Sequence, residues 1–126
     1  MNDTRFFICE HCKNIAGLIQ ASGVPMKCCG QNMTELIPGT VDAAVEKHLP
    51  VANVEGNIVK VNVGEVTHPM SDEHFIQWVY LQTDKGGQRK NLLPTDSPEV
   101  TFALANEKPV AVYAYCNLHG LWKTEI

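Results

Sequence analysis

Four cysteines near the N-terminus have the spacing of a metal site. Two lie in the sequence CEHC, and two adjacent ones lie in CCG. A Cys-x-x-Cys turn brings two thiolates to one ion, and a second pair completes a tetrahedral all-sulfur site that suits zinc or iron. Because the second pair has no spacer, we expect a distorted tetrahedron. We expect His11, inside the first turn, to face solvent as a spacer. The candidate ligands are Cys9, Cys12, Cys28 and Cys29.

The remaining cysteine stands alone near the C-terminus, in YCNLHGLW. A histidine follows it three residues later, and three further histidines lie in EKHLP and HPMSDEH. Pro69 follows His68 and pushes its backbone to an extended conformation, which indicates a defined loop. A lone buried cysteine usually only packs in the core and does not react. A second metal site is favoured by the Cys-x-x-His pair and by the two histidines at the ends of one loop. Its candidate ligands are His48, His68, His74, Cys116 and His119.

These five ligands, if they bind one ion, comprise four nitrogens and one sulfur. Four imidazoles in a plane with an axial thiolate would leave a sixth position open. Zinc prefers four ligands, so five with a vacancy indicate a redox metal such as iron. A thiolate pushes electron density onto the metal and thereby onto a bound dioxygen species, as in thiolate-ligated haem.

The elements that must position these residues are predicted to be mainly β. Residues 57–63 alternate between apolar and polar side chains, and residues 75–82, 100–105 and 110–115 are rich in aromatic and β-branched types. Turn signals lie at 53–57 and 84–88, and a short helical turn is expected within 41–47. Several short strands with regular turns predict an antiparallel sandwich or barrel.

Composition narrows the class of protein. The chain has 126 residues, a net charge of −4 and no run of Lys or Arg, which argues against nucleic acid as a partner. No apolar run approaches the roughly 20 residues that span a bilayer, and the N-terminus lacks the pattern of a signal peptide. We therefore expect a cytoplasmic protein with no membrane partner. In that reducing compartment, five cysteines favour metal ligands or reactive thiols over disulfides.

Taken together, these motifs resemble the desulfoferrodoxin family, the two-iron superoxide reductases. The resemblance covers nearly the whole chain and rests on CEHC, CCG, EKH followed by Pro50, HPM, the EH of SDEHFIQW, and YCNLHG before LWK. It implies a desulforedoxin-like iron-binding domain over residues 1–37 and an immunoglobulin-like antiparallel β-sandwich over residues 38–126. It also implies two irons per chain, one held by the four cysteines and one by four equatorial histidines with Cys116 axial.

The resemblance further implies an activity, the one-electron reduction of superoxide to hydrogen peroxide without release of dioxygen. Glu46 would match the carboxylate that occupies the sixth position of the oxidised iron, and Lys47 would match the lysine that assists superoxide capture. Because the chain is acidic and superoxide is an anion, a local positive charge is needed to steer it in. A homodimer and a rubredoxin-type electron donor are also implied.

Three other functions remain open on the residues alone. A non-enzymatic electron carrier would use the four-cysteine iron and predicts no fast oxidation by superoxide. A zinc-stabilised β-sandwich that only binds partners predicts a colourless protein. A superoxide dismutase predicts that dioxygen is evolved.

Overall fold

The structure is a computed structural model that describes residues 4–41 and 43–126. The chain divides into two compact units, Met1–Ile37 and Pro38–Ile126. The described residues are mainly β, with almost no helix, which confirms the predicted class. Within these same ranges, no helix is long and apolar enough to cross a membrane.

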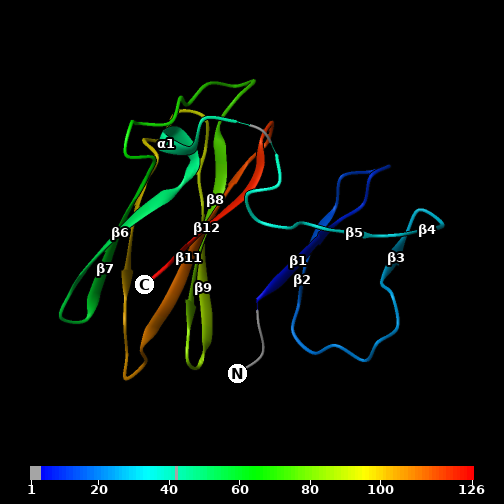
Figure 1. The fold of residues 1–126 in the computed structure, drawn as a ribbon, viewed down its shortest axis with the longest axis horizontal. Coiled ribbons are helices and arrows are strands. Elements are labelled where there is room, and N and C mark those ends of the chain that lie inside the picture. The colour runs from blue at the N-terminus through cyan, green and yellow to red at the C-terminus, as the bar shows by residue number, and fades with distance from the viewer. Residues whose placement is uncertain (1–3, 42) are drawn as a thin grey trace. The chain divides into compact units, whose positions relative to one another are not determined.

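The first unit consists of short strands with a very small core. Strand β1 pairs antiparallel with β2 and β5, and β3 pairs with β4 in a separate hairpin (Figure 1). The bounds are β1 Arg5–Ile8, β2 Ile15–Leu18, β3 Lys27–Cys28, β4 Gln31–Asn32 and β5 Thr34–Glu35. The buried apolar side chains in its described part are those of Phe6, Ile8 and Cys9. So small a core rarely stabilises a domain without a metal or a covalent link.

The second unit is an antiparallel β-sandwich. One sheet has the strand order β10-β7-β6 and the other has the order β12-β11-β8-β9 (Figure 1). The strand bounds are β6 Pro50–Glu55, β7 Ile58–Val63, β8 Ile76–Thr83, β9 Gly86–Asn91, β10 Glu99–Ala103, β11 Pro109–Cys116 and β12 Gly120–Glu125. Helix α1, Val45–His48, precedes β6 at one end of the sandwich.

Alternating side chains on the facing strands of the two sheets form the core of the sandwich. Successive residues of a strand point to opposite faces, so about every second residue of each strand faces the other sheet, and these residues are mostly apolar. The buried cluster includes Val59, Val61 and Val63 of β7, Val100 and Phe102 of β10, Ile76, Val79 and Leu81 of β8, and Val112, Ala114 and Cys116 of β11. Cys116 is therefore the last inward-facing residue of its strand.

Some sequence-based boundaries need correction. The helical turn expected within 41–47 is α1, which begins at Val45 and ends at His48, while Asp42 lies outside the described residues. The helix stops there because Pro50 follows and Leu49 is extended, with φ −67° and ψ 122°. The turns at 53–57 and 84–88 are shorter than expected, because β6 continues to Glu55 and β9 begins at Gly86.

Candidate metal centres

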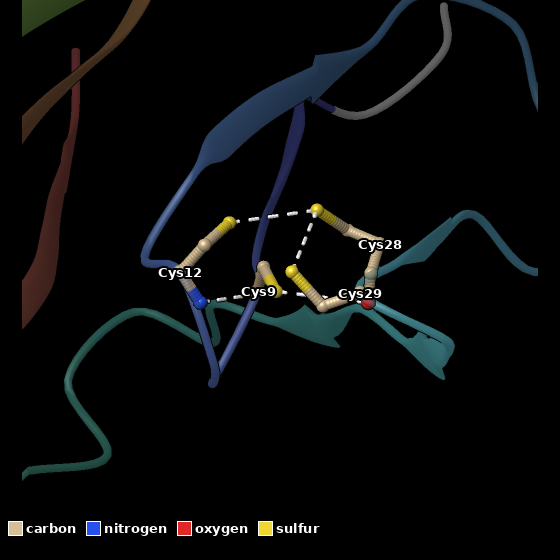
Figure 2. A group of neighbouring side chains, drawn as sticks. All are labelled: Cys9, Cys12, Cys28 and Cys29. Atoms are coloured by element: carbon tan, nitrogen blue, oxygen red, sulfur yellow. Dashed lines mark hydrogen bonds between the residues drawn. The ribbon is translucent and has the colours of Figure 1, made fainter.

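The four cysteines of the first unit converge on one point, as Figure 2 shows. Their sulfur atoms all lie within 4.8 Å of one another. The Sγ atoms of Cys12 and Cys28 are 3.5 Å apart, and those of Cys28 and Cys29 are 4.0 Å apart. A metal–sulfur bond of about 2.3 Å gives edges of about 3.8 Å in a tetrahedron of thiolates. The cluster therefore fits a tetrahedral ion.

A tight hairpin explains how two adjacent cysteines both reach the site. Neighbouring residues of a strand normally point to opposite faces. Cys28 ends β3, and the two residues that link β3 to β4 are Cys29 and Gly30, with φ of 53° and 74°. Two consecutive residues with positive φ are typical of a type I′ hairpin turn. The left-handed backbone at Cys29 turns its thiol to the side of the Cys28 thiol.

The four thiols differ in pKa because they bond to one another and to the backbone. The N–H of Cys12 donates to Sγ of Cys9 over 3.5 Å and lowers the pKa of that thiol to about 6. Hydrogen bonding with Cys12 raises the pKa of Cys28 and raises that of Cys29 to about 12. A single thiolate is therefore stabilised, whereas a full set of four requires a cation among them.

In the second unit, five side chains meet at one end of the sandwich. His48 is the last residue of α1, and Cys116 is the last residue of β11. His68 and His74 lie in the connection between β7 and β8, and His119 lies in the turn between β11 and β12. His48, His68 and Cys116 are buried, whereas His74 and His119 are partly exposed. Folding thus brings together all five residues that the sequence analysis singled out.

The four imidazole rings of this group form a square. In the order His48, His68, His74, His119, neighbouring ring centroids are 4.7 to 5.0 Å apart and neighbouring rings are inclined by 79° to 89°. The opposite rings of His48 and His74 are 6.4 Å apart. Sγ of Cys116 lies within 4.8 Å of nitrogens of His48, His68 and His74, and 3.8 Å from Nδ1 of His119. A sulfur so close to all four nitrogens lies beside the centre of the square and not at a corner.

Hydrogen bonds to the backbone select the nitrogen that each buried ring turns inward. Nδ1 of His48 is 2.6 Å from the carbonyl oxygen of Ala44, and Nδ1 of His68 is 2.7 Å from that of Pro69. Carbonyl oxygens only accept, so both rings carry their proton on Nδ1 and present an unprotonated Nε2. Such anchoring of the outer nitrogen is usual for histidines that bind metals.

The square has the dimensions that suit an ion at its centre. Nitrogen ligands lie about 2.1 Å from a metal such as zinc, so neighbouring nitrogens around a square are about 3.0 Å apart. Nε2 of His48 and Nδ1 of His119 are 3.0 Å apart. In the described part of the chain, Nε2 of His68 and Nε2 of His74 are buried without a hydrogen-bond partner. An ion would supply the partner that such buried atoms normally have.

The electrostatics of the second group also favour metal binding at neutral pH. Burial lowers the pKa of His48 and of His74, and it lowers the pKa of His68 to about 4. These rings are therefore neutral and able to donate lone pairs. Burial also raises the pKa of the Cys116 thiol, against the opposing effect of the backbone N–H groups of Leu118 and His119. A cation beside Cys116 would offset that cost of ionisation.

Three further residues singled out from sequence are exposed. Glu46 and Lys47 belong to α1, directly before His48, and both are exposed. Burial is the main cause of the lowered pKa of His48 and of His74, and the nearby His119 also contributes. The positive charge of Lys47 lowers both pKa values further. The charge of Lys47 therefore acts electrostatically on both of these rings. His11 is exposed, as predicted.

Sequence reasoning gave no role to Trp122, which supports two of the histidines. Its ring stacks on that of His48, with centroids 5.1 Å apart and planes inclined by 29°. Its Nε1–H donates to the carbonyl oxygen of His119 over 3.0 Å. The tryptophan lies three residues after His119 in the sequence, but nothing in that spacing indicates contact with His48, which is far away in the chain.

Comparisons with known proteins agree with this geometry. A family model described as Desulfoferrodoxin matches residues 40–125. A desulfoferrodoxin of Nitratidesulfovibrio vulgaris is 44% identical over 124 residues, which is 98% of each chain. The crystal structure of the superoxide reductase from Treponema pallidum is 42% identical, with a TM-score of 0.83 over 98% of this chain and 100% of that one. A superoxide reductase (1Fe-SOR) from Giardia intestinalis is 29% identical, with a TM-score of 0.56 over 64% of this chain and 97% of that one.

Proposed function

Because this chain belongs to the desulfoferrodoxin family, we propose that it is a superoxide reductase. Superoxide gains one electron and two protons and becomes hydrogen peroxide, and no dioxygen is formed. The observation that carries this proposal is the square of four imidazoles with one thiol beside its centre. An iron bound by these five side chains would supply the electron that reduces superoxide.

Each candidate ligand has a defined part in this function. His48, His68, His74 and His119 would hold the ion, and Cys116 would donate electron density to it. Iron bound there supplies a one-electron couple, which the fixed charge of zinc does not. The neutral state of the buried rings keeps them available as ligands at the pH of the cell.

Lys47 and Glu46, which directly precede His48, would act on the anion at the second centre. The protein carries a net charge of −4, so its overall field repels superoxide. Lys47 is exposed next to His48 and provides a local positive charge that draws the anion toward the square. Glu46 occupies the preceding position and would supply a carboxylate to the second centre when no superoxide is present.

The first unit forms an iron domain over residues 1–37, and residues 38–126 form the reductase domain. The iron of the first domain is held by Cys9, Cys12, Cys28 and Cys29. We propose a rubredoxin-type protein as the electron donor and a homodimer as the assembly, both on the strength of the family. The five free cysteines support a reducing, cytoplasmic location.

Metal analysis and a superoxide pulse test the function. Metal analysis should find two irons per chain, with a visible spectrum from iron bound to sulfur. Superoxide added to the reduced protein without oxygen should oxidise the second centre at near-diffusional rates and yield one hydrogen peroxide per superoxide. Release of dioxygen would instead indicate dismutation. A reduced protein that superoxide does not oxidise would be an electron carrier, and a colourless zinc protein would contradict both iron-based functions.

A further inference from the structure

Asn117 joins two segments that carry candidate ligands. It follows Cys116 directly, and its side chain reaches across to the end of the β7–β8 connection. Its Oδ1 accepts the N–H of Phe75 over 3.0 Å, and its Nδ2 donates to the carbonyl oxygen of Glu73 over 2.9 Å. Its own backbone N–H donates to the carbonyl oxygen of Phe75 over 3.3 Å. One residue thus binds the chain on both sides of His74.

These bonds lie beyond the last regular pairing of β8 with β11. The register between the two strands ends at Cys116 opposite Ile76, after an irregularity between Tyr115 and Cys116. Without the Asn117 side chain, the residues before Ile76 would keep only the backbone bond between residue 117 and Phe75 to hold them against the Cys116 strand. The asparagine amide replaces the missing ladder, since it offers one donor and one acceptor like a peptide group.

His74 depends on this support more than its neighbours do. The rings of His48 and His68 are each anchored by a hydrogen bond from Nδ1 to a backbone carbonyl. Nε2 of His74 is buried without a hydrogen-bond partner among residues 4–41 and 43–126. The position of that ring is therefore set by its backbone and by ring contacts with His68 and His119.

The bonds that His74 forms with Ser71 do not provide the same support. The N–H of Ser71 donates to the carbonyl oxygen of His74 over 3.0 Å, and Ser71 Oγ donates to the same oxygen over 3.2 Å. These bonds close a turn within the connection itself. They leave its position relative to β11 undetermined, and that relative position fixes the distance between His74 and Cys116.

We propose that Asn117 is a positioning residue that holds His74 at the distance from Cys116 which one metal ion requires. The inference rests on the proposed function only in taking His74 and Cys116 as ligands of the same iron. Removing a group that orients a metal ligand without binding the metal itself typically lowers metal affinity by about 10- to 100-fold. Loss of the Asn117 amide should therefore loosen the second centre and leave the first centre unchanged.

Release of iron to a ferrous chelator, followed without oxygen in the full-length reduced protein, tests this role. Asn117→Ala removes both side-chain bonds and should release iron from the second centre about 10- to 100-fold faster than the wild type. Asn117→Asp keeps the volume and the acceptor for Phe75 but turns a carboxylate oxygen toward the carbonyl of Glu73, so release should also be faster. The four-cysteine centre, in the other unit, provides an internal reference whose release rate should not change.

Two matched variants serve as controls. Ser71→Ala removes bonds inside the turn, and Asn53→Ala removes an exposed amide from β6. Both should release iron within about threefold of the wild-type rate, well below the effect of losing an orienting group. In metal-free protein, hydrogen exchange at the Phe75 amide should be faster in Asn117→Ala than in Asn117→Asp, which retains the acceptor.

The outcomes separate this inference from the proposed function. A wild-type protein whose second group holds no iron would overturn both. A wild-type protein that holds two irons, with folded Asn117 variants that release iron at the wild-type rate, would overturn the role of Asn117 alone. If Asn117→Ala does not fold, the Asn117→Asp variant decides the question, because it preserves the volume and one of the two side-chain bonds.

Discussion

Replacing Gly64 by alanine should displace the segment that carries Glu46, Lys47 and His48. Gly64 follows β7, has φ of +89°, and donates its N–H to the carbonyl oxygen of Leu49 over 3.1 Å. A Cβ at this position would lie 2.2 Å from the carbonyl oxygen of Val66 and 2.6 Å from that of Lys47. Both are backbone atoms, so neither can move aside by a simple rotation. The end of α1 and the chain that leads to His68 must therefore separate.

The size of the effect can be worked out against a matched glycine. Gly56 has φ of +60°, and a Cβ there would meet nothing within 4 Å. Alanine at Gly56 should cost only the strain of a left-handed residue, about 1–2 kcal/mol. Alanine at Gly64 should cost that strain plus about 1–3 kcal/mol for overpacking, a total of roughly 2–5 kcal/mol.

Tryptophan fluorescence during urea unfolding measures the loss of stability of the second unit in each of the two variants. The chain has two tryptophans, Trp78 and Trp122, which are both buried in the second unit. Gly64→Ala should also slow the reduction of superoxide, while Gly56→Ala should not, because Gly56 lies in the β6–β7 turn away from the ligands. Equal losses of stability in the two variants would refute the reasoning, since it depends on the contacts of the Gly64 Cβ.

Four further changes should have defined effects. Lys47→Ala should slow superoxide capture by up to about tenfold at low salt and weaken its dependence on ionic strength, as stopped-flow rates at increasing salt would show; an unchanged salt dependence would exclude steering by this lysine. Cys116→Ser should abolish the sulfur-to-iron absorption of the second centre, and a retained band would remove Cys116 from the ligand set. Trp122→Phe keeps an aromatic ring beside His48 but loses the N–H bond to His119, so urea unfolding should show a loss of about 1 kcal/mol. In metal-free protein, the contribution of His68 to the free energy of unfolding should be constant above about pH 6.5 and should fall by about 3 kcal/mol as the pH drops toward 4, because burial lowers the pKa of His68 from 6.5 to about 4 and the unfolded chain then binds the proton more tightly; His68→Gln should flatten this part of the stability curve.

The predicted strands were those whose apolar residues face the core. The alternation at 57–63 and the apolar run at 75–82 correspond to β7 and β8, which supply much of the buried cluster. The edge strand β9, Gly86–Asn91, was not predicted, because it contains two glycines and its side chains are mostly exposed. It is a strand because it pairs with β8. Pairing with a neighbour overrides the weak local preference of such a segment.

The sequence by itself determined the chemistry of this protein. Nine residues in their order, five cysteines and four of the histidines, define an all-sulfur set and a mixed set of ligands, because softness and geometric preference belong to the ligand atoms themselves. The adjacent pair Cys28–Cys29 led us to expect a distorted tetrahedron, but the type I′ hairpin that lets both thiols point inward is evident only from the backbone angles.

The tertiary structure decided how those ligands are arranged. The order of the rings around the square, the nitrogen that each buried ring presents, and the supports from Trp122 and Asn117 all depend on contacts between distant segments. His48 and His119, for example, are 71 positions apart in the chain, and their nitrogens are 3.0 Å apart. Strand register and side-chain packing set such distances, and neither is encoded in the spacing of the ligands along the chain.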